Sequence, residues 1–128
     1  MLHTHYNQIS EVLDKVQAIT TFPQIIEVQA EDELAALLDA LSPHTPWGER
    51  QSAARKLGYK ADPAALPALL DALPSDPFWM VRCAIIQALE RIGDPSAIPT
   101  LQLISKGDRF QVVRSYAAKA IKRLSRHS

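Results

Sequence analysis

The length, composition and charge of the chain exclude several classes of protein. It has 128 residues, of which 47% are hydrophobic and 22% charged, which is the balance of a folded domain rather than a disordered segment. No apolar run approaches the roughly 18 to 20 residues that a membrane span requires, and the opening stretch MLHTHYNQIS lacks the features of a secretory signal. We therefore expect a cytoplasmic protein. The single cysteine, Cys83, excludes an internal disulfide framework.

The formal net charge is zero, but the charges are unevenly distributed. Residues 1–45 carry seven acidic side chains and one basic one, whereas residues 106–128 carry one acidic and seven basic. Such an asymmetry could steer a charged partner or favour head-to-tail self-contact in an elongated molecule. The alternative is that the last helix is simply basic and solvated.

The first segment predicts an amphipathic helix at about residues 5–20. Its apolar side chains recur at helical spacing: Ile9, Val12, Leu13, Val16 and Ile19. This helix does not align with the rest of the chain, so we expect residues 1–32 to form an N-terminal capping helix and a linker. Residues 21–32, TFPQIIEVQAED, are compatible with either a short helix or an extended linker.

The remainder of the chain is a repeat with a period of 32 residues. ELAALLDALSPHTPWGER (33–50) aligns without a gap with ALPALLDALPSDPFWMVR (65–82), and KADPAALPALL (60–70) aligns in the same way with IGDPSAIPTLQ (92–102). A fixed period of this length is typical of helical repeat arrays. The three predicted copies are residues 33–64, 65–96 and 97–128.

Each copy predicts two helices. In the second copy, the first helix has one apolar face formed by Leu66, Leu69, Leu70 and Leu73, and the second helix has another formed by Val81, Ile85, Ala88, Leu89 and Ile92. Asp62-Pro63 and Asp94-Pro95 are typical helix starts, and Gly93 is a typical helix end. One helix pair cannot cover its own apolar face. We therefore predict an all-α fold, a short right-handed α-solenoid of helix-turn-helix repeats.

The stretch DPFWMVRCAIIQALERIGDPSAIPTL (76–101) resembles the HEAT-like repeat of the phycobilisome-lyase type, which reads roughly DPxVRxxAAxALGxIGDPxAIPxL. The resemblance covers about residues 33–125. It departs from the pattern at HTPWGER, which lacks Asp-Pro, and at GDRFQVVR, where Arg109 replaces Pro. Some members of this family attach or remove bilin chromophores on phycobiliproteins in cyanobacteria, others act in phycobilisome turnover, and many are binding scaffolds. The resemblance implies a phycobiliprotein or phycobilisome component as partner, and it transfers no catalytic residue.

The side of the second helices opposite the apolar face predicts a partner-binding surface, with Trp47 and Trp79 stacked one repeat apart. Exposed Trp flanked by Arg and Gln is typical of protein interfaces. The alternative is that each Trp folds back into the core, because large aromatic side chains are highly buried on average. The predicted partner-binding residues are Trp47, Gln51, Arg55, Trp79, Cys83, Gln87 and Lys119.

Three arginines, Arg50, Arg82 and Arg114, recur with the period and could form an anion-binding ladder. We favour a structural role in which each pairs with a loop acid or carbonyl: Asp76 with Arg82, and Asp108 with Arg114. Cys83 has no neighbouring His or Lys to activate it, so we interpret it as a small apolar residue. The histidines do not have the spacing of metal ligands, and no phosphate loop or nucleophile motif is present.

These observations predict a non-catalytic scaffold that binds a partner protein and needs no cofactor. One alternative is a bilin-lyase-like subunit, in which the two Trp residues and nearby basic groups would cradle a tetrapyrrole. Another is nucleic-acid binding by the basic C-terminal helix, although the neutral total charge and acidic first third disfavour a long basic track. The basic residues of that helix are Arg114, Lys119, Lys122, Arg123 and Arg126. The sequence leaves the oligomeric state open.

Overall fold

The computed structural model of the chain describes residues 22–126. They belong to two units, divided after Glu33, and the repeats lie in the second unit. Within the described residues the secondary structure is helical and contains no strand, which confirms the predicted all-α class. The helix expected at residues 5–20 lies outside the described residues.

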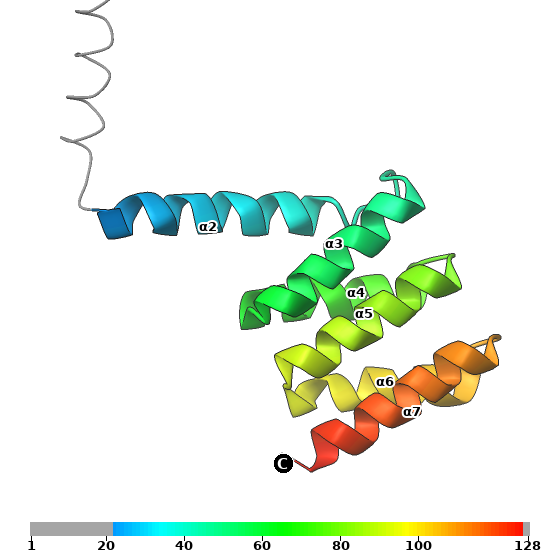
Figure 1. The fold of residues 1–128 in the computed structure, drawn as a ribbon. Coiled ribbons are helices and arrows are strands. Elements are labelled where there is room, and N and C mark those ends of the chain that lie inside the picture. Colours follow the sequence, from blue (N-terminus) through cyan, green and yellow to red (C-terminus); the bar gives the residue numbers. More distant parts are fainter. Residues whose placement is uncertain (1–21, 127–128) are drawn as a thin grey trace, which may run out of the picture. The chain divides into compact units, whose positions relative to one another are not determined.

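Six α-helices form the described chain, in an order that Figure 1 shows. Residues 22–32, for which the sequence left two structures open, belong to the first of them. The helices are α2 (Phe22–Asp39), α3 (Trp47–Lys60), α4 (Leu66–Ser75), α5 (Trp79–Ile92), α6 (Ile98–Gly107) and α7 (Gln111–Ser125).

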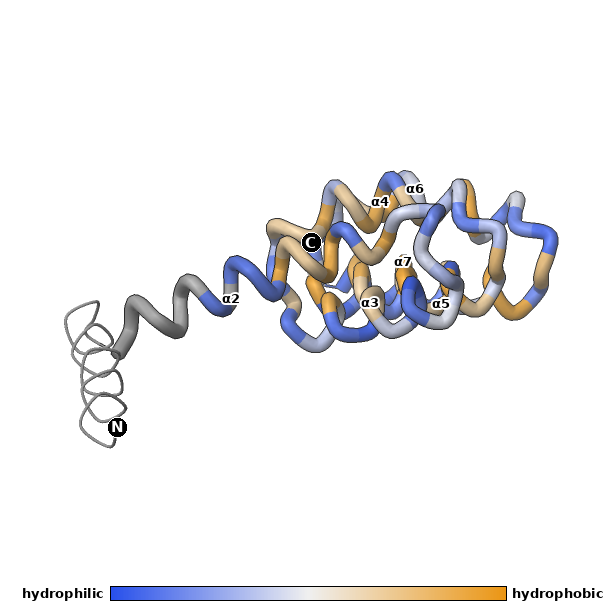
Figure 2. Tube along the Cα trace, turned by 90° about the horizontal axis from the view of Figure 1, so that it is seen from above, coloured by the Kyte–Doolittle hydropathy of each residue, from blue (hydrophilic) through white to orange (hydrophobic). Residues whose placement is uncertain are grey.

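Helices α3 to α7 form two layers, which is the arrangement of a short α-solenoid. The second helices of the repeats, α3, α5 and α7, lie side by side in one layer, and α4 and α6 lie in the other (Figures 1 and 2). Helix α5 packs against both α3 and α7, while α4 and α6 pack against the second helix of their own repeat. The first residues of α3, α5 and α7 are 32 positions apart, so the sequence period is the period of this layer.

The turn chemistry of the sequence sets where the helices begin and end. The Asp62 carboxylate accepts a hydrogen bond from the backbone N–H of Ala64 at 2.9 Å, and Asp94 makes the equivalent contact with Ser96. Each Asp-Pro pair begins a short 3-10 turn, Pro63–Ala65 or Pro95–Ala97, and the α-helix follows directly. The expected helix starts are therefore displaced by one turn.

Helices α3 and α5 end in the left-handed conformation. Gly93 follows α5 with φ of 79°, as its lack of a side chain predicts. In the preceding repeat the same position is Ala61, whose φ is 50°. The repeat geometry thus imposes one backbone conformation on two different residue types.

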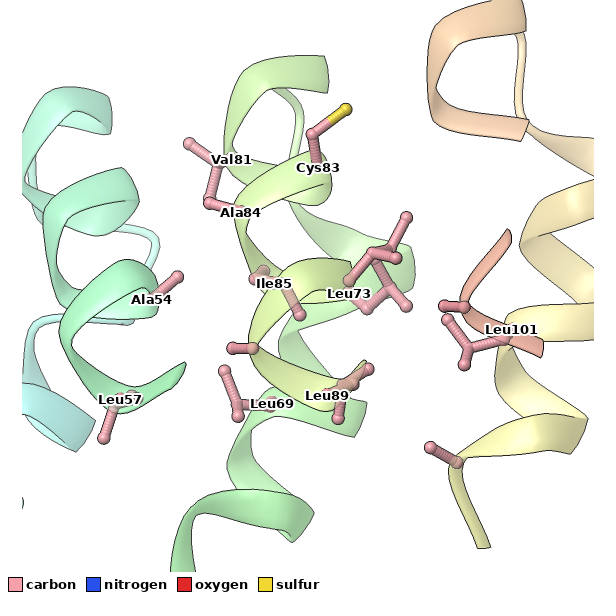
Figure 3. Close-up of a cluster of buried hydrophobic side chains, with 14 of the residues drawn as sticks. Ala54, Leu57, Leu69, Leu73, Val81, Cys83, Ala84, Ile85, Leu89 and Leu101 are labelled. Carbon is pink, nitrogen blue, oxygen red and sulfur yellow. The ribbon is translucent and has the colours of Figure 1, made fainter. Parts of the chain in front are cut away.

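The hydrophobic core runs between the two layers and through neighbouring repeats (Figure 3). Helix α5 is buried on most of its circumference because α3 and α7 flank it on two sides and α4 packs on a third. This explains why Cys83 is only 8% exposed, so its expected position on an exposed side was wrong. The largest fully buried side chains are Leu57, Leu69, Leu73, Val81, Ile85, Ile86, Leu89, Leu101, Val113 and Leu124.

Candidate partner-binding surface

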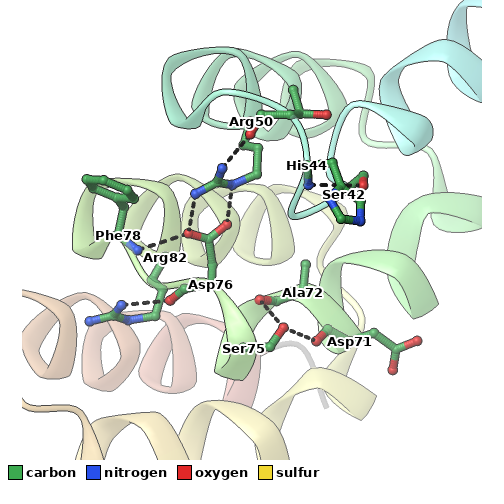
Figure 4. A network of polar contacts seen from close by, with 10 residues as sticks. Ser42, His44, Arg50, Asp71, Ala72, Ser75, Asp76, Phe78 and Arg82 are labelled. Carbon is green, nitrogen blue, oxygen red and sulfur yellow. Dashed lines mark hydrogen bonds and ion pairs between the residues drawn. The ribbon is translucent and has the colours of Figure 1, made fainter.

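Buried ion pairs join each repeat to the next. Arg50 donates from Nε and Nη2 to the two carboxylate oxygens of Asp76, at 2.8 and 3.1 Å (Figure 4). Arg82 makes the same two hydrogen bonds to Asp108, at 2.7 and 3.0 Å. Two parallel hydrogen bonds between a guanidinium and a carboxylate fix orientation as well as distance. The arginines therefore hold the register of the second helices.

The predicted pairings of Arg82 with Asp76 and of Arg114 with Asp108 are confirmed, and of the two partners left open, acid or carbonyl, it is the carbonyl that the arginine contacts. Arg82 contacts Asp76 only through the backbone, by donating from Nη1 to its carbonyl at 2.8 Å, and Arg114 contacts the carbonyl of Asp108 in the same way. The carboxylates face the helix of the preceding repeat, which packs alongside the turn. The predicted structural role of the arginines is confirmed, but their acidic partners lie one repeat away.

The two Trp side chains stack on Phe residues rather than on each other. Trp47 lies on Phe78, with ring centroids 5.4 Å apart and planes 20° apart, and Trp79 lies on Phe110 at 6.3 Å and 37°. Trp47 is 39% exposed and Trp79 is 37% exposed. Both Trp side chains thus lie at the surface, each held on the Phe of the next repeat.

A groove follows the layer of second helices. Near the N-terminal ends of α5 and α7 it has a volume of about 390 Å³, and Trp79, Val112 and Tyr116 line it. Nearer the C-terminal ends of these helices a second hollow of about 470 Å³ continues it. Gln87 and Tyr116 line both hollows, so the two are parts of one groove.

Most of the predicted partner-binding residues line this groove. Trp47 does not line either hollow, and Lys119 lines only the second. Cys83 contributes to the wall despite its low exposure. The predicted residues that line the first hollow are Gln51, Arg55, Trp79, Cys83 and Gln87. The structure thus gathers six of the seven predicted residues on one concave surface.

The groove also contains residues that were not predicted as partner-binding, among them Tyr116, Arg91 and Arg123. The sequence carried a signal for these three. Arg91 and Arg123 each follow a predicted site residue, Gln87 and Lys119, by four positions, and residues four apart share a helix face. Tyr116 precedes the predicted residue Lys119 by three positions and shares its helix face in the same way, although its equivalent in the preceding repeat is an alanine.

The charge of the groove is predominantly positive. The guanidinium of Arg91 lies 4.6 Å over the ring of Tyr59. Arg123 forms an ion pair with Glu90. Within the described part of the chain, Arg55 and Lys119 form no ion pair. These cations give the groove an excess of positive charge.

The Cys83 thiol is not set up as a nucleophile. Burial raises its pKa to about 11, with a further rise from the charge of Asp108, and the positive charge of Arg82 only partly opposes this. The thiol is therefore neutral at pH 7, whereas the thiolate is the reactive form. The described residues also contain no group of three or more His, Cys, Asp or Glu side chains that could hold a metal ion.

Paired helices, a fixed period and a grooved layer of second helices define a helical repeat protein of the solenoid class. A family model for HEAT repeats matches residues 34–122. The chain therefore belongs to the HEAT repeat family, whose repeats generally mediate contacts between proteins. No curated protein matches the chain. Among the described helices, none is both long and apolar enough to cross a membrane.

Proposed function

We propose that this protein is a non-catalytic scaffold that binds a partner protein in the groove across α3, α5 and α7. The observation that carries the proposal is the groove itself, which combines an exposed aromatic anchor with several polar and basic side chains. Concave surfaces with a few convergent polar groups are typical binding sites, and large aromatic side chains commonly dominate the binding energy at protein interfaces.

The anchor is held in place before a partner arrives. Trp79 rests on Phe110, and the guanidinium of Arg82 lies 5.9 Å from the centre of the same ring. Arg82 is in turn fixed by its ion pair with Asp108. A side chain already ordered in the free protein loses less conformational entropy on binding. The inter-repeat ion pairs thus support the binding surface as well as the fold.

For the identity of the partner, we propose a phycobiliprotein or a phycobilisome component. The support is the sequence resemblance of residues 76–101 to the phycobilisome-lyase type of HEAT-like repeat. Binding of purified phycobiliproteins to the immobilised chain, measured by biolayer interferometry, tests this class directly. Absence of binding at micromolar concentrations would contradict it and leave the scaffold role in place.

The bilin-handling and nucleic-acid alternatives rest on the sequence alone. Burial and the raised pKa of the Cys83 thiol disfavour the attachment of a bilin to this residue through a thioether bond. In the basic C-terminal helix, Arg123 is already paired with Glu90. Changes in bilin absorbance on mixing, and salt-dependent binding to duplex DNA, are the measurements that would favour one of these alternatives.

The two Trp residues provide a matched test of the scaffold proposal. Trp79→Ala removes the anchor of the groove, whereas Trp47→Ala removes a similarly exposed Trp that stacks on Phe78 outside it. We expect wild type and Trp47→Ala to capture the same partner from native lysate, and Trp79→Ala to lose it. Circular dichroism checks that both variants remain folded. Equal capture by all three folded proteins would place the binding surface elsewhere.

A further inference from the structure

We infer that the groove selects an acidic segment of the partner that also carries one apolar side chain. The inference rests on the proposed function, because it assigns the chemistry of the segment that occupies the same groove. It follows from the distribution of charge and apolar surface along the groove.

Three cations line the groove without an acidic partner among the described residues: Arg55, Arg91 and Lys119. Of the acidic side chains in the described chain, Glu90 lines the groove, and it is already paired with Arg123. Like charges gathered along a concave surface concentrate their field there and attract the opposite charge. Complementary charge of this kind mainly sets specificity and the rate of association.

The arginines present donors that suit carboxylates. The planar guanidinium of Arg91 lies on the ring of Tyr59 rather than against an acid. Stacking holds the plane of the guanidinium while its edge keeps N–H groups for a ligand. A carboxylate can accept two of these hydrogen bonds at once.

Stabilisation of helix ends accounts for only some of the cations in the groove. Basic residues in the last turn of a helix offset the partial negative charge of its C-terminus, and the effect falls off within that turn. Arg91 and Arg123 lie close enough to the ends of α5 and α7 for this role. Arg55 and Lys119 lie further inside α3 and α7. Their positions on the groove therefore require another reason.

The apolar end of the groove lies at Trp79, and the basic end includes Arg91 on the same helix. At a rise of about 1.5 Å per residue, α5 separates these two positions by about 18 Å. An extended peptide spans that distance in about five to six residues. The segment that fits has an apolar side chain at one end and acidic side chains about five residues away.

A displayed library of random peptides of about twelve residues tests this assignment. Selection on the wild-type chain, with counter-selection on the folded Trp79→Ala variant, should enrich peptides with one large apolar residue and a net negative charge. Enrichment of neutral or basic peptides would overturn the inference and leave the groove as the binding site. If no peptide prefers wild type over Trp79→Ala, the proposed function fails as well.

Charge reversal of groove residues then tests whether the acidic side chains of the selected peptide bind beside Arg55 and Lys119. The double variant Arg55→Glu, Lys119→Glu should weaken binding of the selected peptide by about tenfold or more in fluorescence polarisation. The control is Lys56→Glu, Lys106→Glu, which changes the net charge equally at exposed positions that do not line the groove. We expect its affinity to stay within about twofold of wild type. Equal losses in both variants, or none in either, would overturn the inference.

A second copy of the chain is the competing occupant, because Glu31 and Asp32 are exposed acidic residues of this chain. Light scattering across a range of protein concentrations distinguishes it. We expect no self-association that depends on Arg55 and Lys119. A dimer formed by wild type and abolished by Arg55→Glu, Lys119→Glu would assign the groove to the second copy and overturn the inference.

Discussion

Ala61 shows how the fold imposes a conformation that its residue type resists. Its φ of 50° lies in the left-handed region, which costs an L-residue about 1 kcal/mol or more. The equivalent residue, Gly93, adopts a φ of 79° without that cost. The two positions therefore form a natural pair for substitution.

We expect Ala61→Gly to stabilise the chain by about 0.5 kcal/mol, because relief of the backbone strain exceeds the entropy that glycine adds to the unfolded state. Gly93→Ala is the reciprocal control and should destabilise it by about 1 kcal/mol. Midpoints of urea denaturation measure both effects. A lower midpoint for Ala61→Gly would contradict the strain argument.

Gly58 allows α3 and α5 to approach each other closely. A Cβ built at this position would lie 2.9 Å from the Cα of Ala88, which is a backbone atom and cannot easily move. Helix propensity alone favours alanine over glycine here. The steric conflict reverses that preference, since the two helices would have to separate.

We expect Gly58→Ala to destabilise the chain by about 1 to 3 kcal/mol. Gly48 is the matched control, because it lies on the same helix and a Cβ there meets no atom within 4 Å. Gly48→Ala should raise the free energy of unfolding by about 0.5 kcal/mol through helix propensity. Thermal denaturation followed by circular dichroism compares the two variants. A stabilising Gly58→Ala would show that the interface between α3 and α5 is loose.

At the scale of the structural element, the turn between the two helices of a repeat contains the aspartate that binds the preceding repeat. Asp76 and Asp108 lie in these turns, and the carboxylate of each binds the Arg of the second helix in the preceding repeat. The backbone carbonyl of each accepts a hydrogen bond from the Arg of the second helix that follows the turn. Each also accepts a hydrogen bond from the backbone N–H two residues later, at 3.0 Å. One aspartate thus fixes the turn, its own helix and the neighbouring helix.

The Asp108 junction should make stability depend on pH. Burial alone would raise the pKa of Asp108, but hydrogen bonds from Arg82 and Phe110, with the charges of Arg82 and Arg114, lower it below the ordinary value. Because the pKa is lower in the folded state, the stabilisation is present above about pH 4 and is lost as the pH falls through the lowered pKa.

Asp108→Asn isolates this contribution. We expect the variant to be less stable than wild type by about 2 kcal/mol at pH 7, and the difference to shrink towards pH 2 as the wild-type carboxylate is protonated. Asp71→Asn, at an exposed position on α4, is the control and should differ little from wild type at either pH. Urea denaturation at pH 7 and pH 2 measures the differences. A gap that stays constant with pH would exclude the charged form of Asp108 as its source.

At the scale of the whole repeat array, stacking creates both the core and the binding surface. Leu69 and Leu73 on α4 and Ile85 and Leu89 on α5 belong to a single cluster that also includes residues of α3, α6 and α7. No single repeat contains this cluster, which is the expected behaviour of a solenoid. The groove likewise exists only where α3, α5 and α7 lie side by side.

The sequence by itself determined the period of 32, the paired helices and most of their ends. These features depend on residues a few positions apart: apolar spacing within one helix, a carboxylate that caps the next turn, and a glycine that ends a helix. Six of the seven predicted partner-binding residues also line the groove, because a helix face follows from the same local spacing.

Only the tertiary structure decided the acidic partners of Arg50 and Arg82, the burial of Cys83 and the Phe partners of the two Trp residues. Arg50 and Asp76 are 26 residues apart and meet because neighbouring repeats pack side by side. Cys83 is buried because α7 covers a side of α5 that one helix cannot cover for itself. The physical reason is one of range: local spacing fixes which face a residue occupies, and lateral packing between repeats fixes what that face meets.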